Sequence, residues 1–165
     1  MREAPAYFRR RGKHYLITSG TTGYHPNPSE VAVADTFHGP WTVLGDPSPN
    51  DSSGTSYNSQ VSSVFKYPGK KDLYIALADR WVPDLPEKEG AAFTTGEAAI
   101  AVRSAYGKLA SGNASRITKP EWTAFNAAPL NINSSAARYV WLPLRFEGDH
   151  PFIDWRDEWS LDEFE

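Results

Sequence analysis

The chain contains no cysteine among its 165 residues, and its four histidines lack the spacing of metal ligands. Disulfide bonds, thiolate metal sites and a cysteine nucleophile are therefore excluded. No run approaches the roughly 18 apolar residues of a membrane-spanning helix, so no membrane partner is expected. Acidic residues outnumber basic ones by 20 to 17, and the basic cluster at residues 9–11 falls on a turn. Nucleic acid is therefore not an expected partner.

Aromatic and turn-forming residues are abundant by contrast. Six Trp, eight Tyr and eight Phe accompany thirteen Pro and twelve Gly, a composition typical of many short strands joined by turns. Segments of strand character recur with turn signals between them, at 6–10, 14–19, 30–35, 42–44, 60–67, 73–78, 138–146 and 151–155. The sequence therefore predicts an all-β fold, with Trp141 and Trp155 in its core.

Residues 83–137 interrupt this strand pattern. The segment Thr94-Thr95-Gly96-Glu97 has the form of a capping box, and apolar residues at helical spacing follow it until Gly112. A second box, Thr118-Lys119-Pro120-Glu121, predicts a shorter helix. We expect a helical insertion that lies over the sheets and either edges a binding cleft or hides sheet surface.

Several segments together resemble one family of enzymes. In chain order they are Glu3-Ala4-Pro5-Ala6 with the hairpin after it, Thr18 to Tyr24, Tyr57-Asn58-Ser59-Gln60, Ala78-Asp79-Arg80-Trp81, and Arg138 to Leu144 followed by Trp155 to Trp159. They resemble glycoside hydrolase family 43, the five-bladed β-propeller glycosidases, and within it the exo-β-1,3-galactanase branch. The resemblance covers about residues 1–82 and 137–165 and leaves the central stretch unexplained.

The resemblance implies catalytic roles for two residues. Glu3 matches the general acid of the family, which protonates the leaving oxygen of the glycosidic bond. Most of the family uses an Asp near the domain start as base, and this chain has no counterpart of it. In the galactanase branch the glutamine of an Asn-Ser-Gln segment is thought to replace that Asp, and Gln60 matches it. As a neutral amide, Gln60 would position water or act as its imidic tautomer; the alternative is a hydrogen bond to a sugar hydroxyl or to its own backbone.

The resemblance also implies contacts with the terminal sugar. Thr22, Gly23 and Tyr24 match the family's Thr-Gly-Trp loop, with Tyr in place of Trp, and a simple glycine turn is the alternative reading. Asn58 lies in the Asn-Ser-Gln segment and is expected to bind substrate.

Arg80 ends a predicted strand that should point toward the propeller axis. A guanidinium there would orient a carboxylate or a sugar hydroxyl. A structural salt bridge to Asp79 or Asp84 is the alternative.

We therefore expect residues 1–165 to form the C-terminal part of a five-bladed β-propeller, with two or three four-stranded blades and a helical insertion at about 83–137. The expected activity is hydrolysis of terminal sugars with inversion, as a galactan 1,3-β-galactosidase. One alternative is an α-L-arabinofuranosidase or β-xylosidase of the same family, which the Gln60 segment disfavours. The other is a carbohydrate-binding truncation without catalysis.

The first blades are expected to precede Met1, so residues 1–165 alone should be inactive and should self-associate through uncovered sheet. The expected partner is an oligosaccharide or polysaccharide, and no cofactor is expected. An axial calcium occurs in some relatives, but the sequence does not locate one. The full-length enzyme is expected to be extracellular or periplasmic.

Overall fold

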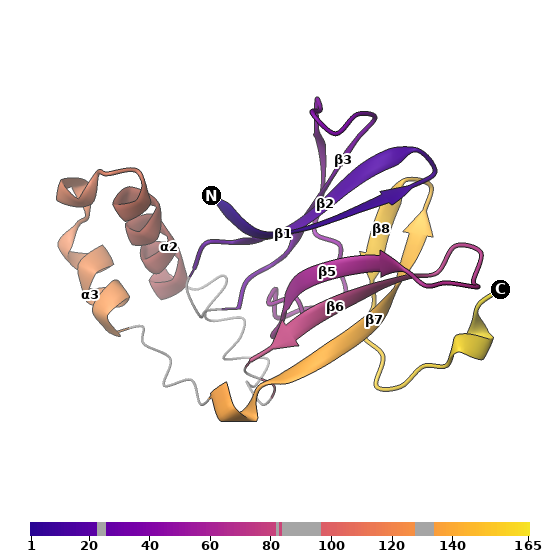
Figure 1. Cartoon of the computed structure of the whole chain (residues 1–165). Coiled ribbons are helices and arrows are strands. Elements are labelled where there is room, and N and C mark those ends of the chain that lie inside the picture. Colours follow the sequence, from indigo (N-terminus) through magenta and orange to yellow (C-terminus); the bar gives the residue numbers. More distant parts are fainter. Residues whose placement is uncertain (23–25, 82, 84–96, 128–133) are drawn as a thin grey trace.

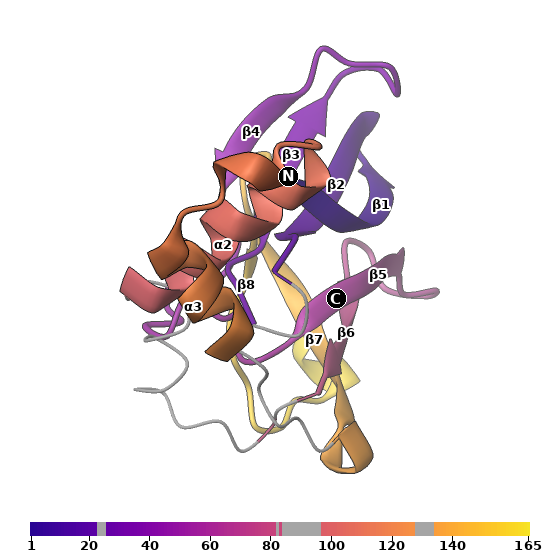
Figure 2. The same cartoon turned by 90° about the vertical axis from the view of Figure 1, so that its left-hand side faces the viewer.

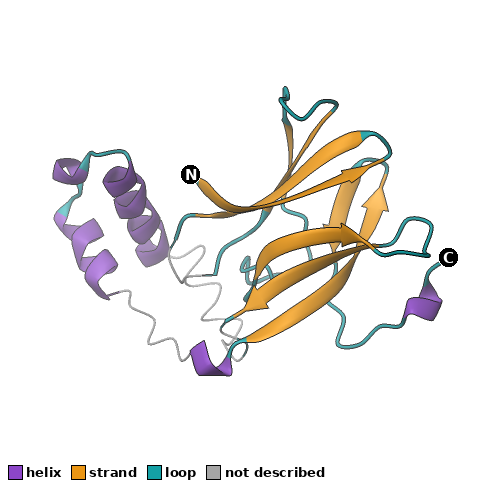
Figure 3. Cartoon of the chain, viewed as in Figure 1, coloured by secondary structure: helices purple, strands orange, loops and turns teal. Residues whose placement is uncertain are grey.

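Two antiparallel sheets of four strands each form the body of the protein (Figures 1 and 3). The structure is a computed structural model of residues 1–165 and describes all of them except 23–25, 82, 84–96 and 128–133. The first sheet contains β1 (Arg2–Arg10), β2 (Lys13–Gly20), β3 (Glu30–Ala34) and β4 (Thr42–Gly45). The second contains β5 (Gln60–Lys66), β6 (Tyr74–Arg80), β7 (Arg138–Glu147) and β8 (His150–Ile153). Spatial order follows chain order, so each sheet is a meander.

All eight predicted strand segments are confirmed, with differences at their ends. The largest is in β1, which begins at Arg2 rather than at residue 6. The predicted helical insertion is also confirmed, because the described residues contain two α-helices beside the strands. Within the described part of the chain the strands form two sheets and not a closed ring.

The hairpin between β1 and β2 follows directly from its sequence. Arg11 and Gly12 form a two-residue loop between the paired residues Arg10 and Lys13. Both loop residues have positive φ, 49° and 84°, as a type I′ turn requires, and glycine adopts this conformation without steric cost. The expected tight turn is thus confirmed.

Apolar side chains fill the space between the two sheets. Phe8 and Tyr15 stack with their ring centroids 4.8 Å apart, and Tyr74 and Phe146 contact the ring of Phe8. The buried members of this core are Ala6, Phe8, Tyr15, Ile17, Val31, Val61, Val64, Tyr74, Ala76, Ala78, Leu142, Leu144 and Ile153. Along β1 and β2 they alternate with less buried residues, as expected of strands with one face on the core.

Trp141 and Trp155 do not lie in this core, which corrects the prediction. The side chain of Trp141 is 52% exposed and that of Trp155 is 36% exposed. Leu142 and Leu144 are buried in the core, so their face of β7 is the inner one. Trp141 falls on the opposite face by the two-residue period of a strand. Tyr139, two residues earlier on that outer face, is 80% exposed.

Two helices occupy the chain between β6 and β7, as the insertion pattern predicts. They are α2 (Glu97–Ala110) and α3 (Lys119–Ala127), and they pack against each other. Figures 1 and 2 agree that the pair lies beside the end of the sheets where β1 begins. No helix in the described ranges is long and apolar enough to cross a membrane.

The second capping box is confirmed, whereas residues 94–96 of the first lie outside the described residues. The Thr118 N–H donates to Glu121 Oε2 at 2.6 Å, and the Glu121 N–H donates to Thr118 Oγ1 at 3.4 Å. Glu121 also accepts from Ser104 Oγ at 2.5 Å and Lys108 Nζ at 2.6 Å, both on α2. One carboxylate therefore caps α3 and joins the two helices.

Candidate functional site

Glu3 and Gln60 meet at one end of the two sheets. Glu3 is the second residue of β1 and Gln60 is the first residue of β5, and β1 and β5 are adjacent although they belong to different sheets. The same end contains the last residue of β6, Arg80. The structure thus brings three of the predicted site residues to one edge of the molecule.

A β-bulge in β1 decides which way Glu3 points. Glu3 pairs with Ser19 and Ala6 pairs with Ile17, so β1 has one residue more than β2 over this interval. If β1 were a regular strand through residues 3–6, Glu3 would share the outer face of β1 with Tyr7 by the period of two. The bulge places it on the same side as Ser19, which is buried and faces the second sheet. Ala4, inside the bulge, has a φ of 48°.

The Gln60 amide bridges the two sheets. Its Nε2 donates to Ser19 Oγ at 2.6 Å and to Glu3 Oε1 at 3.3 Å. The two groups of an inverting glycosidase stand roughly 6.5–9.5 Å apart to admit a water molecule. The Glu3 and Gln60 side chains are closer than this, so a sugar and a water would enter only after the weaker of the two Gln60 hydrogen bonds, the one to Glu3, opens.

Charged groups next to Glu3 are held in fixed positions. Arg2 Nε donates to Thr18 Oγ1 at 3.0 Å and lies 3.7 Å from Glu30 Oε1. Burial lowers the pKa of Arg2, and Glu30 and Asp46 act in the opposite direction. Burial raises the pKa of Asp46, although the backbone N–H of Ser48 stabilises its charged form.

Thr22 and Asn58 lie among buried polar side chains beside this edge of the molecule. Asn27 Nδ2 donates to Thr22 Oγ1 at 2.8 Å, and Asn27 Oδ1 accepts from the Gly20 N–H at 2.6 Å. Thr55 Oγ1 donates to Asn58 Oδ1 at 2.9 Å. Thr22 is 4% exposed and Asn58 is 8% exposed. Both side chains hold neighbouring loops together, and their contact with a sugar stays a prediction.

These buried polar side chains are closely packed. A cavity lined in part by Ser56, Tyr57 and Ser59 has a volume of about 10 Å³, at most the space of one water molecule. It is therefore not a sugar site. Gly23 and Tyr24, the other predicted loop residues, lie outside the described residues.

Arg80 packs against an aromatic ring. Its Nε donates to the Tyr57 carbonyl at 3.0 Å, and its Cζ lies 4.6 Å above the ring of Trp155. The ring of Tyr57 also contacts Trp155, with centroids 5.5 Å apart. Asp84, one of the alternative ion-pair partners, lies outside the described residues. The half-exposed Trp155 and Arg80 together form a cation–π pair at this edge.

Asp51 was not singled out by the sequence reasoning, yet it organises the loop before Gln60. Its carboxylate accepts hydrogen bonds from the backbone N–H groups of Ser53, Thr55 and Tyr57 at 3.1, 2.8 and 2.9 Å. The signal that could have revealed it is the run Asp-Ser-Ser-Gly-Thr-Ser at 51–56, because short polar side chains in succession favour turns built on side-chain to backbone hydrogen bonds.

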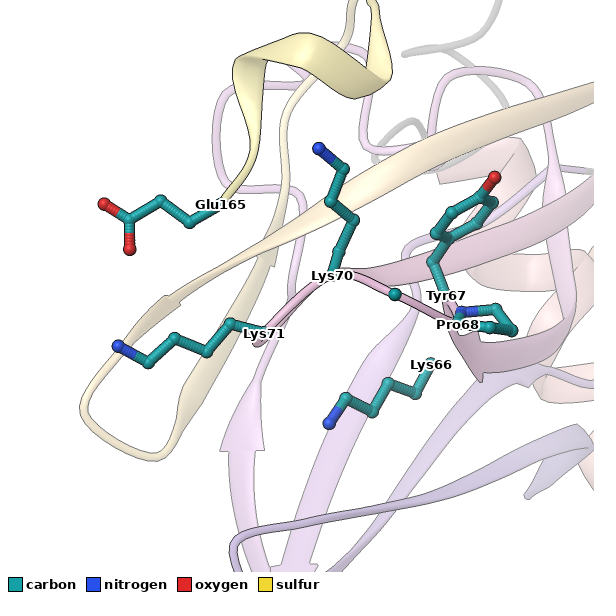
Figure 4. Close-up of a pocket in the computed structure, with 7 residues that line it drawn as sticks. Lys66, Tyr67, Pro68, Lys70, Lys71 and Glu165 are labelled. Atoms are coloured by element: carbon teal, nitrogen blue, oxygen red, sulfur yellow. The ribbon is translucent and has the colours of Figure 1, made fainter.

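A separate hollow lies at the other end of β5 (Figure 4). It is lined by Lys66, Tyr67, Pro68, Gly69, Lys70, Lys71 and Glu165. Lys70 Nζ donates to the Phe164 carbonyl at 2.8 Å, which fastens the end of the chain to the β5–β6 hairpin. Because Gln60 and Lys66 are the two ends of β5, this hollow is not part of the candidate site. Among the described residues, no group of three or more His, Asp or Glu side chains could hold a metal ion.

Solved structures of known enzymes match nearly the whole chain. A GH43 β-1,3-galactosidase solved with galactodeoxynojirimycin has a TM-score of 0.60 at 24% identity, over 97% of this chain and 32% of its own. A second GH43 β-1,3-galactosidase has a TM-score of 0.63 at 24% identity, over 99% of this chain and 24% of its own. The chain has the fold of part of a GH43 enzyme.

An exo-β-1,3-galactanase from Clostridium thermocellum has the same GH43-like arrangement, with a TM-score of 0.53 at 24% identity over 93% of this chain and 23% of its own. The chain therefore spans about a quarter to a third of these GH43 proteins. No family model and no curated protein matches the sequence. The likeness establishes the fold, and it agrees with the family that the sequence segments resemble.

Proposed function

We propose that the chain supplies the acid-bearing part of an inverting glycoside hydrolase that acts on terminal β-1,3-linked galactose. The observation that carries the proposal is the meeting of Glu3 and Gln60 across two sheets of a GH43-like fold. Glu3 would protonate the leaving oxygen, and Gln60 would position the attacking water. Several of the structures with this fold are described as β-1,3-galactosidases or exo-β-1,3-galactanases, which supports the choice of sugar.

The partial coverage of those proteins favours a second candidate, carbohydrate binding without hydrolysis. A fragment of a propeller can keep the sugar contacts of its own loops while it lacks groups from other blades. The two candidates differ in whether a bond is broken. They are separated by measuring galactose binding and galactoside hydrolysis on the same preparation.

The decisive variant is Glu3→Gln in the protein expressed from its complete gene. Hydrolysis of β-1,3-galactobiose, which has a poor leaving group, should fall roughly 10²- to 10⁴-fold, as expected for loss of a general acid. Hydrolysis of 2,4-dinitrophenyl β-galactoside should change little, because its leaving oxygen needs no proton. Rates are measured by release of galactose and of dinitrophenolate.

Glu147→Gln is the matched control, since Glu147 is exposed and ends β7 far along the chain from the site. Equal losses on both substrates would reject the acid role of Glu3. Faster cleavage of an α-L-arabinofuranoside or a β-xyloside than of the galactoside would reject galactose as the substrate. Galactose binding by a wild-type protein that hydrolyses none of these substrates would support the second candidate.

A further inference from the structure

Three successive residues before Gln60 have left-handed backbone conformation. The φ angles of Ser56, Tyr57 and Asn58 are 54°, 59° and 58°. Residues with side chains rarely adopt this region, and they do so as single residues rather than in runs. Strained backbone of this kind persists only where surrounding contacts determine it. The turn at 56–58 therefore needs a specific restraint.

Asp51 provides that restraint. Its Oδ2 accepts from the N–H groups of Thr55 and Tyr57, and its Oδ1 accepts from the N–H and the hydroxyl of Ser53. Hydrogen bonds to an ionised acceptor are stronger than neutral ones. The carboxylate thus fixes alternate backbone amides on the approach to the turn and within it.

The turn at 56–58 is connected to two residues of the candidate site, Arg80 and Gln60. Its Tyr57 carbonyl accepts from Arg80 Nε at 3.0 Å. The Ser59 N–H donates back to the Ser56 carbonyl at 3.2 Å, and the next residue is Gln60, where β5 begins. The direction in which Gln60 leaves the turn decides whether its amide reaches Ser19 and Glu3.

We propose that Asp51 is a positioning residue for this site: it sets the left-handed turn that directs Gln60 toward Glu3 and orients Arg80. The inference rests on the proposed function for its catalytic meaning, but its structural content is testable without any substrate. Among the described residues, Asp51 makes no hydrogen bond to Glu3 or Gln60. It would therefore act through the backbone of residues 53–58.

The test is Asp51→Asn, which keeps the size of the side chain and removes one acceptor. Whichever way the amide turns, its NH₂ group faces N–H donors that Asp51 now satisfies. Amide hydrogen exchange should speed up roughly tenfold to a hundredfold at the residue that loses its acceptor, which is Ser53 if NH₂ replaces Oδ1 and Thr55 or Tyr57 if it replaces Oδ2, as expected for loss of a hydrogen bond to a charged group. The side-chain amide NMR signal of Gln60 should move to the position of a free amide. That signal is assigned by its loss in Gln60→Glu.

Asp72→Asn is the control for a general loss of stability. Asp72 pairs with Arg10 at the opposite end of the sheets, so this variant should leave the exchange of Tyr57 and the Gln60 signal unchanged. If Asp51→Asn does not fold, Thr55→Val replaces it, because the Thr55 hydroxyl joins Ser53, Asn58 and the same carboxylate.

Accelerated exchange together with a displaced Gln60 signal supports the inference. Two results overturn it: protected amides in Asp51→Asn, or fast exchange with an unmoved Gln60 signal. A displaced signal in Asp72→Asn would also overturn it, since the effect would then be one of stability. Failure of galactoside hydrolysis in the wild-type protein rejects the proposed function and leaves these NMR results standing, so the two failures are distinguishable.

Discussion

Two buried regions of this protein are built from opposite chemistry. Between the sheets lie aromatic and aliphatic side chains, with Phe8 stacked on Tyr15. At the end that carries Glu3 lies a region of small polar residues that are equally buried, comprising Thr22, Asn27, Ser29, Ser53, Thr55, Ser56, Asn58 and Ser59. The first region needs apolar area and matching volume, whereas the second needs a partner for every hydrogen-bonding atom.

The difference between the apolar and the polar region explains why the site is rigid. Hydrophobic attraction has no direction, so many packings of similar volume satisfy the apolar region. Hydrogen bonds are directional, and a buried group without its partner costs free energy. The polar region is therefore suited to hold one backbone path, including the turn at 56–58.

The largest effect on stability is expected in the apolar region. Ile17 is fully buried on β2 between two neighbouring strands, so Ile17→Ala should lower the free energy of unfolding by about 2–5 kcal/mol. Urea denaturation measures the loss. The Gln60 side-chain signal of the folded variant should stay in place; its displacement would show that the two regions are not separate.

A smaller loss of stability with a larger effect on the site is expected from Ser56→Ala. The Ser56 hydroxyl accepts from the Ser29 N–H at 2.8 Å and lies 2.9 Å from the Ser29 hydroxyl. Removing it leaves buried groups unpaired and should cost about 1–3 kcal/mol. Urea denaturation gives the cost, and the Gln60 signal should move.

Ser62→Ala is the control, because Ser62 is an exposed serine on β5 and its replacement should change stability by less than about 0.5 kcal/mol. If Ser56→Ala and Ser62→Ala behave alike, the polar region does not depend on its hydrogen bonds.

The contact between α2 and α3 tests whether hydrogen bonds outside the sheets also hold their elements together, as those of the polar region do. Hydrogen bonds from Lys108 first, then from Ser104 and the Thr118 N–H, lower the pKa of Glu121 to about 2 from 4.5. Because the pKa is lower in the folded state, the carboxylate stabilises the pair above about pH 4.5, and this contribution is lost as the pH falls toward 2.

The loss should appear in the fluorescence of Trp122, which lies on α3 next to Glu121, between pH 5 and 2. Glu121→Gln should lack this transition, and Glu147→Gln should retain it. Persistence of the transition in Glu121→Gln would contradict the assignment.

Much of the fold could be predicted because its signals are local. The Arg11–Gly12 turn and the box from Thr118 to Glu121 each depend on a few adjacent residues. The eight strands follow in the same way from short segments of strand character and the turn residues between them. The exposure of Trp141 could not be predicted, because the face of a strand that meets the core depends on the neighbouring sheet.

The site could be predicted only in part. The resemblance indicated Glu3 and Gln60, and the structure places them together, but their catalytic roles stay predictions. The direct contact between them was not expected. The hydrogen bonds by which Asp51 holds the loop before Gln60 were not expected either. Neither the bulge at Ala4 nor the left-handed turn has a glycine to mark it, so the usual signal of positive φ is missing.

The bulge in β1 also bears on how such a site arises or disappears over evolutionary time. A substitution alters one side chain and leaves the alternation of faces along a strand intact. The three steps from Glu3 to Ala6 are an odd number, so a regular strand of the same length would put the carboxylate on the outer face, and the bulge absorbs the odd step. The presence of this carboxylate in the site is therefore encoded by the bulge as much as by residue identity, and changes that straighten β1 between Glu3 and Ala6 are those to which it is most sensitive.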